Sequence, residues 1–167
     1  AASLIVTTGR ADTTLWITDS SGLFSDAANW SAGVPSNDDV ALFNRGNGIT
    51  YTVTFPGRPI LQSPYISQVL NFGTNNVTFR ESFLPTRGQS IYTTATIVMG
   101  APSGPSVLNS QLSTLEGSRA TIGLIGSAHP TTLNVNFGSF IVTGTTEAET
   151  ELVIGNDGNG TLNVFRD

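Results

Sequence analysis

Apolar and polar residues alternate in short runs along most of this chain, and no segment keeps a helical spacing of apolar residues over three turns without a Gly or Pro. Alternation with a period of two is typical of strands with one buried face. Clusters of Gly, Asn, Pro and Ser separate the runs, as turns separate strands. Only Ser25 to Asn29 favours a helical turn, which is too short to stand alone. We expect strands at 4–8, 14–18, 40–43, 50–55, 77–80, 92–99, 121–125, 132–137, 140–143, 151–154 and 161–165.

An internal repeat organises the last third of the chain. Each copy is a strand that ends in Gly, a turn rich in Gly, Pro, Asn and Ser, and a second strand built around a Leu-Asn pair. The leucines of these pairs are Leu108, Leu133 and Leu162, which recur at intervals of about 25 to 29 residues. A repeat of roughly 20–30 residues made of strands and turns is typical of a solenoid.

Stacking of the repeats explains their pattern physically. Alternation places Leu133 and Val135 on one face of a strand and Thr132 and Asn134 on the other. One repeat cannot bury its own apolar face, but stacked repeats join these faces into a continuous core.

The same stacking aligns Asn109, Asn134 and Asn163 in a column. Their amides either bond along the stack, as in cross-β assemblies, or point separately into solvent. The sequence leaves both alternatives open, because it fixes strand register only weakly.

Composition narrows the class of protein. Charged residues make up 11% of the chain, 18 residues are Gly, and the seven basic residues are scattered arginines. Low charge with many β-branched residues suits strands and disfavours long solvated helices. A net charge of -5 without a basic stripe argues against nucleic-acid binding. No apolar run approaches the ~20 residues that cross a bilayer, so we expect no membrane insertion.

The first quarter carries an aromatic motif, and the end carries a Gly-rich one. The front stretches are Leu15-Trp16, 21–25, 28–35 and 38–43. They resemble the opening segment of autotransporter-type passengers and of exported bacterial proteins with a PEP-CTERM anchor, in which a W…G-x-W/F…NW…G-x-P…D-x-A-x-F string precedes β-helical repeats. Residues 154–164 are similar to the IG-x-x-G-x-G-x-L-x-V repeat of the same passengers. The resemblance implies a right-handed parallel β-helix outside the cell and no catalytic residue.

The aromatic residues of the front segment also make sense as an end cap. Trp16, Phe24, Trp30 and Phe43 are large apolar groups among turn residues. A solenoid must cover the apolar end of its first turn, and such rings provide that cover. The alternative is that these rings form an exposed platform on which sugars stack.

Candidate catalytic residues are few. The single histidine, His129, precedes Pro130 in a turn between two expected strands, and the chain lacks the partners for a catalytic triad or a histidine metal cluster. We interpret His129 as a turn residue. The Ser and Thr residues likewise have no evident base to activate them.

Two groups of carboxylates are the other candidates. Asp38 and Asp39 are adjacent and would face opposite ways in a strand, whereas Glu147, Glu149 and Glu151 would share one face if extended. We interpret the glutamates as a solvated loop, with a cation site as the alternative. Lyase chemistry on acidic polysaccharides is disfavoured, because it also needs an Arg or Lys base.

The segment Asn156–Gly160 reads as a tight turn, because Asn-Gly and Asp-Gly pairs favour one. Calcium binding is the alternative, but the segment is not followed by the acidic ligand that completes a calcium-binding loop. We expect no other cofactor or metal. Acceptor sequences for N-glycosylation occur at Asn29, Asn76 and Asn159.

These observations predict one all-β domain over 1–167, a β-solenoid with a cap-like opening segment over 1–56, irregular strands over 57–96 and three repeats over 97–167. We expect a secreted, non-catalytic structural or assembly protein of the bacterial surface. An adhesin-like or carbohydrate-binding module is one alternative, and a β-helical polysaccharide lyase or hydrolase is another.

The strand at 161–165 predicts association, because little follows it to cover its edge. We expect a second copy or another surface protein to add a strand there, with Leu4 to Thr8 as a candidate strand. The alternative is that the next repeat of a longer passenger covers this end.

Overall fold

The structure, a computed structural model, describes residues 12–46, 48–57, 65–82, 90–101, 103–123, 129–136, 138–143, 151–155 and 158–165. Strands account for most of these residues, and their bounds are β1 (Thr13–Leu15), β2 (Gly22–Leu23), β3 (Val40–Phe43), β4 (Thr50–Pro56), β5 (Tyr65–Phe72), β6 (Asn76–Ser82), β7 (Ile91–Met99), β8 (Ser106–Gln111), β9 (Thr114–Ile122), β10 (Thr131–Val135), β11 (Ser139–Val142), β12 (Glu151–Ile154) and β13 (Gly160–Val164).

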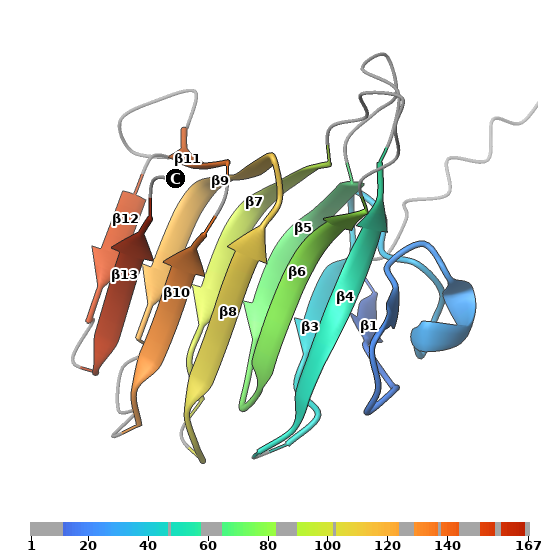
Figure 1. The fold of residues 1–167 in the computed structure, drawn as a ribbon, viewed down its shortest axis with the longest axis horizontal. Helices are drawn as coiled ribbons and strands as arrows, with labels where there is room; N and C mark the ends of the chain where they lie inside the picture. Colours follow the sequence, from blue (N-terminus) through green and yellow to red (C-terminus); the bar gives the residue numbers. More distant parts are fainter. Residues whose placement is uncertain are drawn as a thin grey trace, which may run out of the picture.

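The strands form two parallel sheets that face each other (Figure 1). The back sheet has the order β1-β3-β5-β7-β9-β11, with β12 also paired to β9, and the front sheet has the order β13-β10-β8-β6-β4-β2. The chain therefore alternates between the sheets, and each strand pairs with one from the neighbouring turn. This topology is a parallel β-solenoid, which confirms the predicted fold class.

The core fills the space between the two sheets. Inward positions alternate with outward ones, so Leu108 and Leu133 lie in register in adjacent turns and are both fully buried. Positive φ angles at Gly100, Gly123 and Gly155 let the chain turn where three of the repeat strands end. The inward placement of Leu133 and Val135 agrees with the alternation seen in the sequence.

The strand predictions differ from the structure mainly in the middle of the chain. The bounds of β3 and β12 match the prediction, but β5 is missed entirely. The alternation of β5 is interrupted where Gln68 and Val69 both face outward, which hides its strand pattern. Within 57–96, where the sequence predicts irregular strands, β5 pairs in parallel with β7 of the back sheet and β6 pairs in parallel with β4 of the front sheet. The expected strand at 4–8 lies outside the described residues.

Among the described residues, one short helical turn accompanies the strands. A 3₁₀ helix spans Ala27–Asn29, and Asp26 caps it by accepting a hydrogen bond from the N–H of Ala28 at 3.0 Å. It lies within the segment for which the sequence predicts a helical turn. In the described part of the chain, no helix has the length and apolar character that crossing a membrane requires.

Candidate functional site

Aromatic rings close the N-terminal end of the solenoid. The ring of Trp16 packs edge-on against Trp30, with centroids 5.2 Å apart, and stacks on Tyr51 at 5.9 Å. Phe24 lies 5.1 Å from Trp30, whose Nε1 donates a hydrogen bond to the carbonyl oxygen of Phe24 at 2.8 Å. With Phe43, these predicted cap residues are at most 3% exposed. The packing prediction is therefore confirmed, and the sugar-stacking alternative is wrong because the rings face the core.

The cap also covers the outer edge of β1. The N–H of Leu15 donates to Oγ of Ser31 at 2.9 Å, and the N–H of Ser31 donates back to the carbonyl oxygen of Leu15 at 2.9 Å. The N–H of Ile17 donates to the carbonyl oxygen of Asn29, also at 2.9 Å. Residues 29–31 thus satisfy backbone groups that an edge strand would otherwise leave open.

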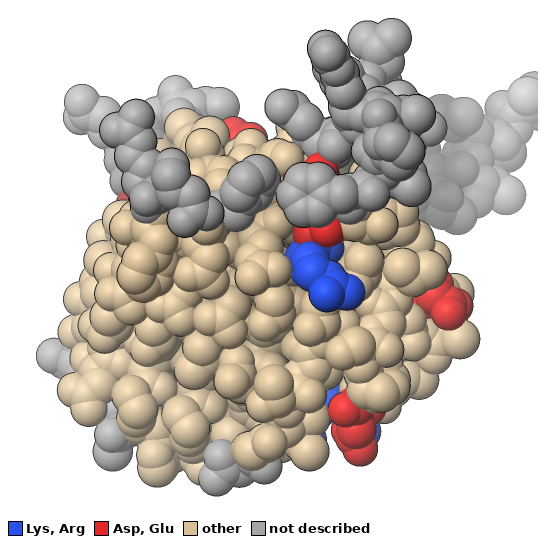
Figure 2. Space-filling model, in the orientation of Figure 1, with Lys and Arg blue, Asp and Glu red and all other residues tan. Residues whose placement is uncertain are grey.

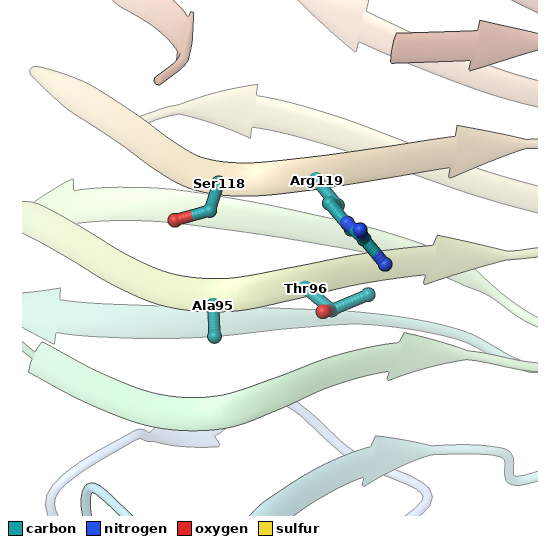
Figure 3. Close-up of a pocket in the computed structure, with 4 residues that line it drawn as sticks. All are labelled: Ala95, Thr96, Ser118 and Arg119. Atoms are coloured by element: carbon teal, nitrogen blue, oxygen red, sulfur yellow. The ribbon is translucent and has the colours of Figure 1, made fainter. Parts of the chain in front are cut away.

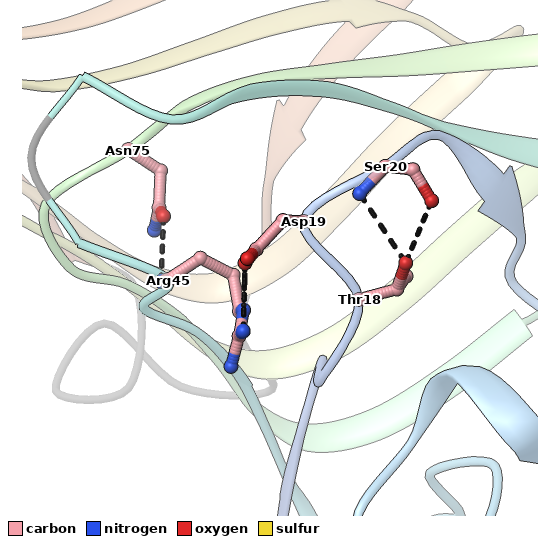
Figure 4. A network of polar contacts seen from close by, with 5 residues as sticks. All are labelled: Thr18, Asp19, Ser20, Arg45 and Asn75. Carbon is pink, nitrogen blue, oxygen red and sulfur yellow. Dashed lines mark hydrogen bonds and ion pairs between the residues drawn. The ribbon is translucent and has the colours of Figure 1, made fainter.

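Polar contacts fix the cap to the following turns (Figure 4). The guanidinium of Arg45 lies 2.6 Å from the carboxylate of Asp19, and the N–H of Arg45 donates to Oδ1 of Asn75 at 2.7 Å. Thr18 and Ser20 share a hydroxyl contact of 2.8 Å beside them. Because the carboxylate of Asp19 is mostly exposed, this ion pair adds little to stability but orients the loop.

Asp39 holds the loop that follows the cap. Its Oδ2 accepts hydrogen bonds from the N–H of Ser36 at 2.8 Å and from the Ser36 hydroxyl at 2.7 Å, and its Oδ1 accepts from the N–H of Asp12 at 3.3 Å. Partial burial raises the pKa of Asp39, but these hydrogen bonds outweigh burial and hold the pKa below its ordinary value.

An asparagine ladder runs along the outer face of the front sheet. Nδ2 of Asn163 donates to Oδ1 of Asn134 at 2.9 Å, and Nδ2 of Asn134 donates to Oδ1 of Asn109 at 2.8 Å. The ladder extends to Oδ1 of Asn76 at 3.2 Å, a member that the repeat did not reveal. Bonding along the stack is therefore confirmed. Figure 2, which views this face, shows few charged side chains on it.

At the C-terminal end, apolar side chains continue the inward positions of the interior turns. No other described residues cover them. Leu152 and Ile154 are in register with Ala120 and Ile122, and each is 45% exposed, whereas the two residues below them are buried. Val164 is in register with Val135 and is 66% exposed. Among the described residues, the inward face of β12 and β13 is therefore open, in contrast to that of the N-terminal end.

The remaining predicted residues do not converge on one site in the described part of the chain. His129 is half-buried in the turn before β10, and Glu151 is exposed on β12, in register with Arg119. Asp38 is exposed. No group of three or more His, Cys, Asp or Glu among these residues is placed to hold a metal ion.

Other candidates lie partly or wholly outside the described residues. These are Glu147, Glu149 and, within the Asn156–Gly160 turn, Asn156 and Asp157. Of the glycosylation sequences, Asn76 is exposed, whereas Asn29 is half-buried and its Nδ2 donates to the carbonyl oxygen of Leu23.

The topology and the buried aromatic cluster define the class of this protein, an all-β parallel β-solenoid closed at its N-terminal end. Comparisons with protein families, with curated proteins and with solved structures find no match to the chain.

Proposed function

We propose that this protein is a non-catalytic structural solenoid of the bacterial cell surface that assembles through its C-terminal end. The observation that carries the proposal is the open inward face of β12 and β13, where Leu152 and Ile154 are 45% exposed and Val164 is 66% exposed. Exposed apolar patches of this kind mark interaction surfaces on soluble proteins. The resemblance of the aromatic opening segment to exported bacterial passengers supports the extracellular location.

The partner that fits this end best is a second copy of the chain. The open face repeats the inward pattern of the turn below it, so its complement is another β-layer of the same kind. A second copy carries such a layer, and strand addition would satisfy the outer backbone groups of β13 at the same time. A closed cap makes the N-terminal end of the partner a poor match, because residues 29–31 already occupy the edge of β1.

Sedimentation velocity over a range of protein concentrations tests the proposal. We expect the wild type to form a larger species as its concentration rises, and Leu152→Glu to weaken this association at least tenfold, because it places a charge on the open face. Leu23→Glu is the matched control, since Leu23 is 47% exposed at the other end and Leu152 is 45% exposed. We expect this control to associate like the wild type.

Three results bear on the alternatives. A wild type that stays monomeric at every concentration would contradict self-assembly. Equal weakening by Leu23→Glu would contradict assembly through the C-terminal end. Loss of association on removal of residues 1–8 would instead identify that segment as the added strand, as the sequence suggests for Leu4 to Thr8.

A further inference from the structure

The back sheet bends along one line across three of its strands. At each crossing of this line, two consecutive residues face outward, which breaks the alternation. The N–H groups of both Gln68 and Val69 donate to the carbonyl oxygen of Asp39, at 2.9 and 3.3 Å, as in a β-bulge. The outward pairs are Gln68-Val69 on β5, Ala95-Thr96 on β7 and Ser118-Arg119 on β9.

Buried hydroxyl groups hold this bend from the inside. Ser67, Thr94 and Gly117 face inward in register just before the bend. The hydroxyl of Tyr92 donates to Oγ of Ser67 at 2.8 Å, and Oγ1 of Thr94 donates to the carbonyl oxygen of Gln68 at 3.1 Å. The bend is therefore fixed by the fold and is present before any ligand arrives.

On the outside, the bend forms a shallow groove. Two hollows of about 330 and 360 Å³ share Ala95 and Ser118 as their common floor. Figure 3 shows Ala95 and Thr96 on one strand and Ser118 and Arg119 on the next, where both strands bend. Because it crosses β5, β7 and β9 in turn, the groove runs along the solenoid axis. Its size falls within the range of roughly 300–1,000 Å³ that small ligands occupy.

The chemistry of the walls points to a neutral, hydroxyl-rich ligand. The groove is lined by the guanidinium of Arg119, which has an interaction partner within the protein, and by the hydroxyl groups of Thr93, Thr96 and Ser118 and the amides of Gln68 and Asn37. The hydroxyl and amide groups both donate and accept hydrogen bonds, as sugar hydroxyls do. The net charge of -5 disfavours a polyanion.

We propose that this groove binds an extended neutral glycan that lies along the solenoid axis. The direction follows from the line of the bend, which places Val69, Thr96 and Arg119 in register on successive strands about 4.8 Å apart. A longer glycan would therefore contact more of these strands, so affinity should rise with the length of the glycan. This site is on the outer face of the back sheet and is independent of assembly through the C-terminal end.

Titration of the protein with cellohexaose, xylohexaose and chitohexaose, followed by NMR chemical shifts, tests this proposal. We expect at least one of the three to bind the wild type and Ala95→Phe to weaken that binding at least tenfold, because the ring fills the shared floor. Val98→Phe is the matched control, since Val98 faces outward on the same strand and does not line the groove. It should bind within twofold of the wild type, as should Leu152→Glu.

Further variants keep the proposal testable if Ala95→Phe disturbs the sheet. Gln68→Ala and Thr93→Ala remove wall groups without adding bulk, and together they should weaken binding at least fivefold while the far-ultraviolet circular dichroism stays unchanged. Absence of binding by all three neutral hexamers would overturn the proposal. So would stronger binding of a galacturonate hexamer than of any neutral one, or equal losses in Ala95→Phe and Val98→Phe.

Discussion

The apolar core of this solenoid is covered differently at its two ends. At the N-terminal end, the rings of Trp16, Phe24 and Trp30 cover the core and are almost completely buried. At the C-terminal end, Leu152 and Val164 occupy the same inward positions as buried residues one turn below, yet they are 45% and 66% exposed. Interior turns cover one another's apolar faces, so the two ends differ from the interior in needing some other cover.

This comparison separates stability from assembly. Large rings in a closed cap contribute apolar burial within one chain, and residues 29–31 also satisfy the edge of β1. An end built from ordinary inward residues gains its burial only when another layer covers it. We therefore expect substitutions at the N-terminal end to affect the free energy of unfolding, and substitutions at the C-terminal end to affect association.

The largest expected effect is at the cap. Trp30→Ala should lower the free energy of unfolding by about 3–5 kcal/mol, because it leaves a cavity among the buried rings and removes the hydrogen bond from Nε1 to Phe24. Urea denaturation at low protein concentration measures this change. The matched substitution Phe165→Ala removes an aromatic ring that is 53% exposed at the other end and should cost less than about 1 kcal/mol. Equal losses would contradict the difference between the ends.

Two leucines in one column give a sharper version of the same comparison. Leu133→Ala should destabilise the monomer by about 2–5 kcal/mol, because Leu133 is fully buried between its neighbours in register, Leu108 and Leu162. Leu162→Ala should cost clearly less, since Leu162 is only partly buried. Denaturation of both variants under identical conditions decides the order, and a larger loss at Leu162 would show that the last turn is covered in the monomer.

The asparagine ladder should show a smaller gradient along the stack. Asn134 both donates to Asn109 and accepts from Asn163, whereas Asn163 has only its bond to Asn134 among the described residues. At about 0.5–1.5 kcal/mol for each hydrogen bond, Asn134→Ala should cost roughly twice as much as Asn163→Ala. Indistinguishable denaturation midpoints for both variants and the wild type would mean that the ladder adds no stability.

The smallest expected effect is a dependence on pH at Asp39. Its folded pKa lies below the ordinary value, so its ionised form is favoured by folding. The resulting stability is present above the unfolded pKa, near 4, and is lost as the pH falls through the lower folded value. Asp39→Asn should therefore flatten the stability profile in this acidic range. Parallel profiles for the wild type and the variant would rule out this contribution.

The sequence predicts those parts of the fold in which one motif recurs. The Leu-Asn pairs indicate both the inward leucines and the asparagine column, and the concentration of rings near Trp16 and Trp30 indicates the cap. Asn76 escapes prediction because it contacts Asn109 diagonally, whereas the residue in register with Asn109 is Thr78. The sequence repeat alone does not show that the asparagine of the neighbouring turn lies two residues before the position in register.

The groove could not be predicted because its residues share no motif. Gln68, Ala95 and Ser118 differ in type and come from three separate turns, and only the register of the back sheet aligns them. The same outward pairs interrupt the alternation of β5 and β9, where strand prediction failed, and of β7, which was predicted because it is richer in β-branched residues. The local irregularity that hides these strands in the sequence is the feature that shapes the surface.

Amide hydrogen exchange at low and high protein concentration tests the central claim most directly, because it reports on each end separately. We predict that the amides of β12 and β13 exchange at least tenfold more slowly at high concentration, while those of β1 and β2 exchange at an unchanged rate. Exchange in β12 and β13 that does not depend on concentration, or slowing confined to β1 and β2, would contradict assembly through the C-terminal end.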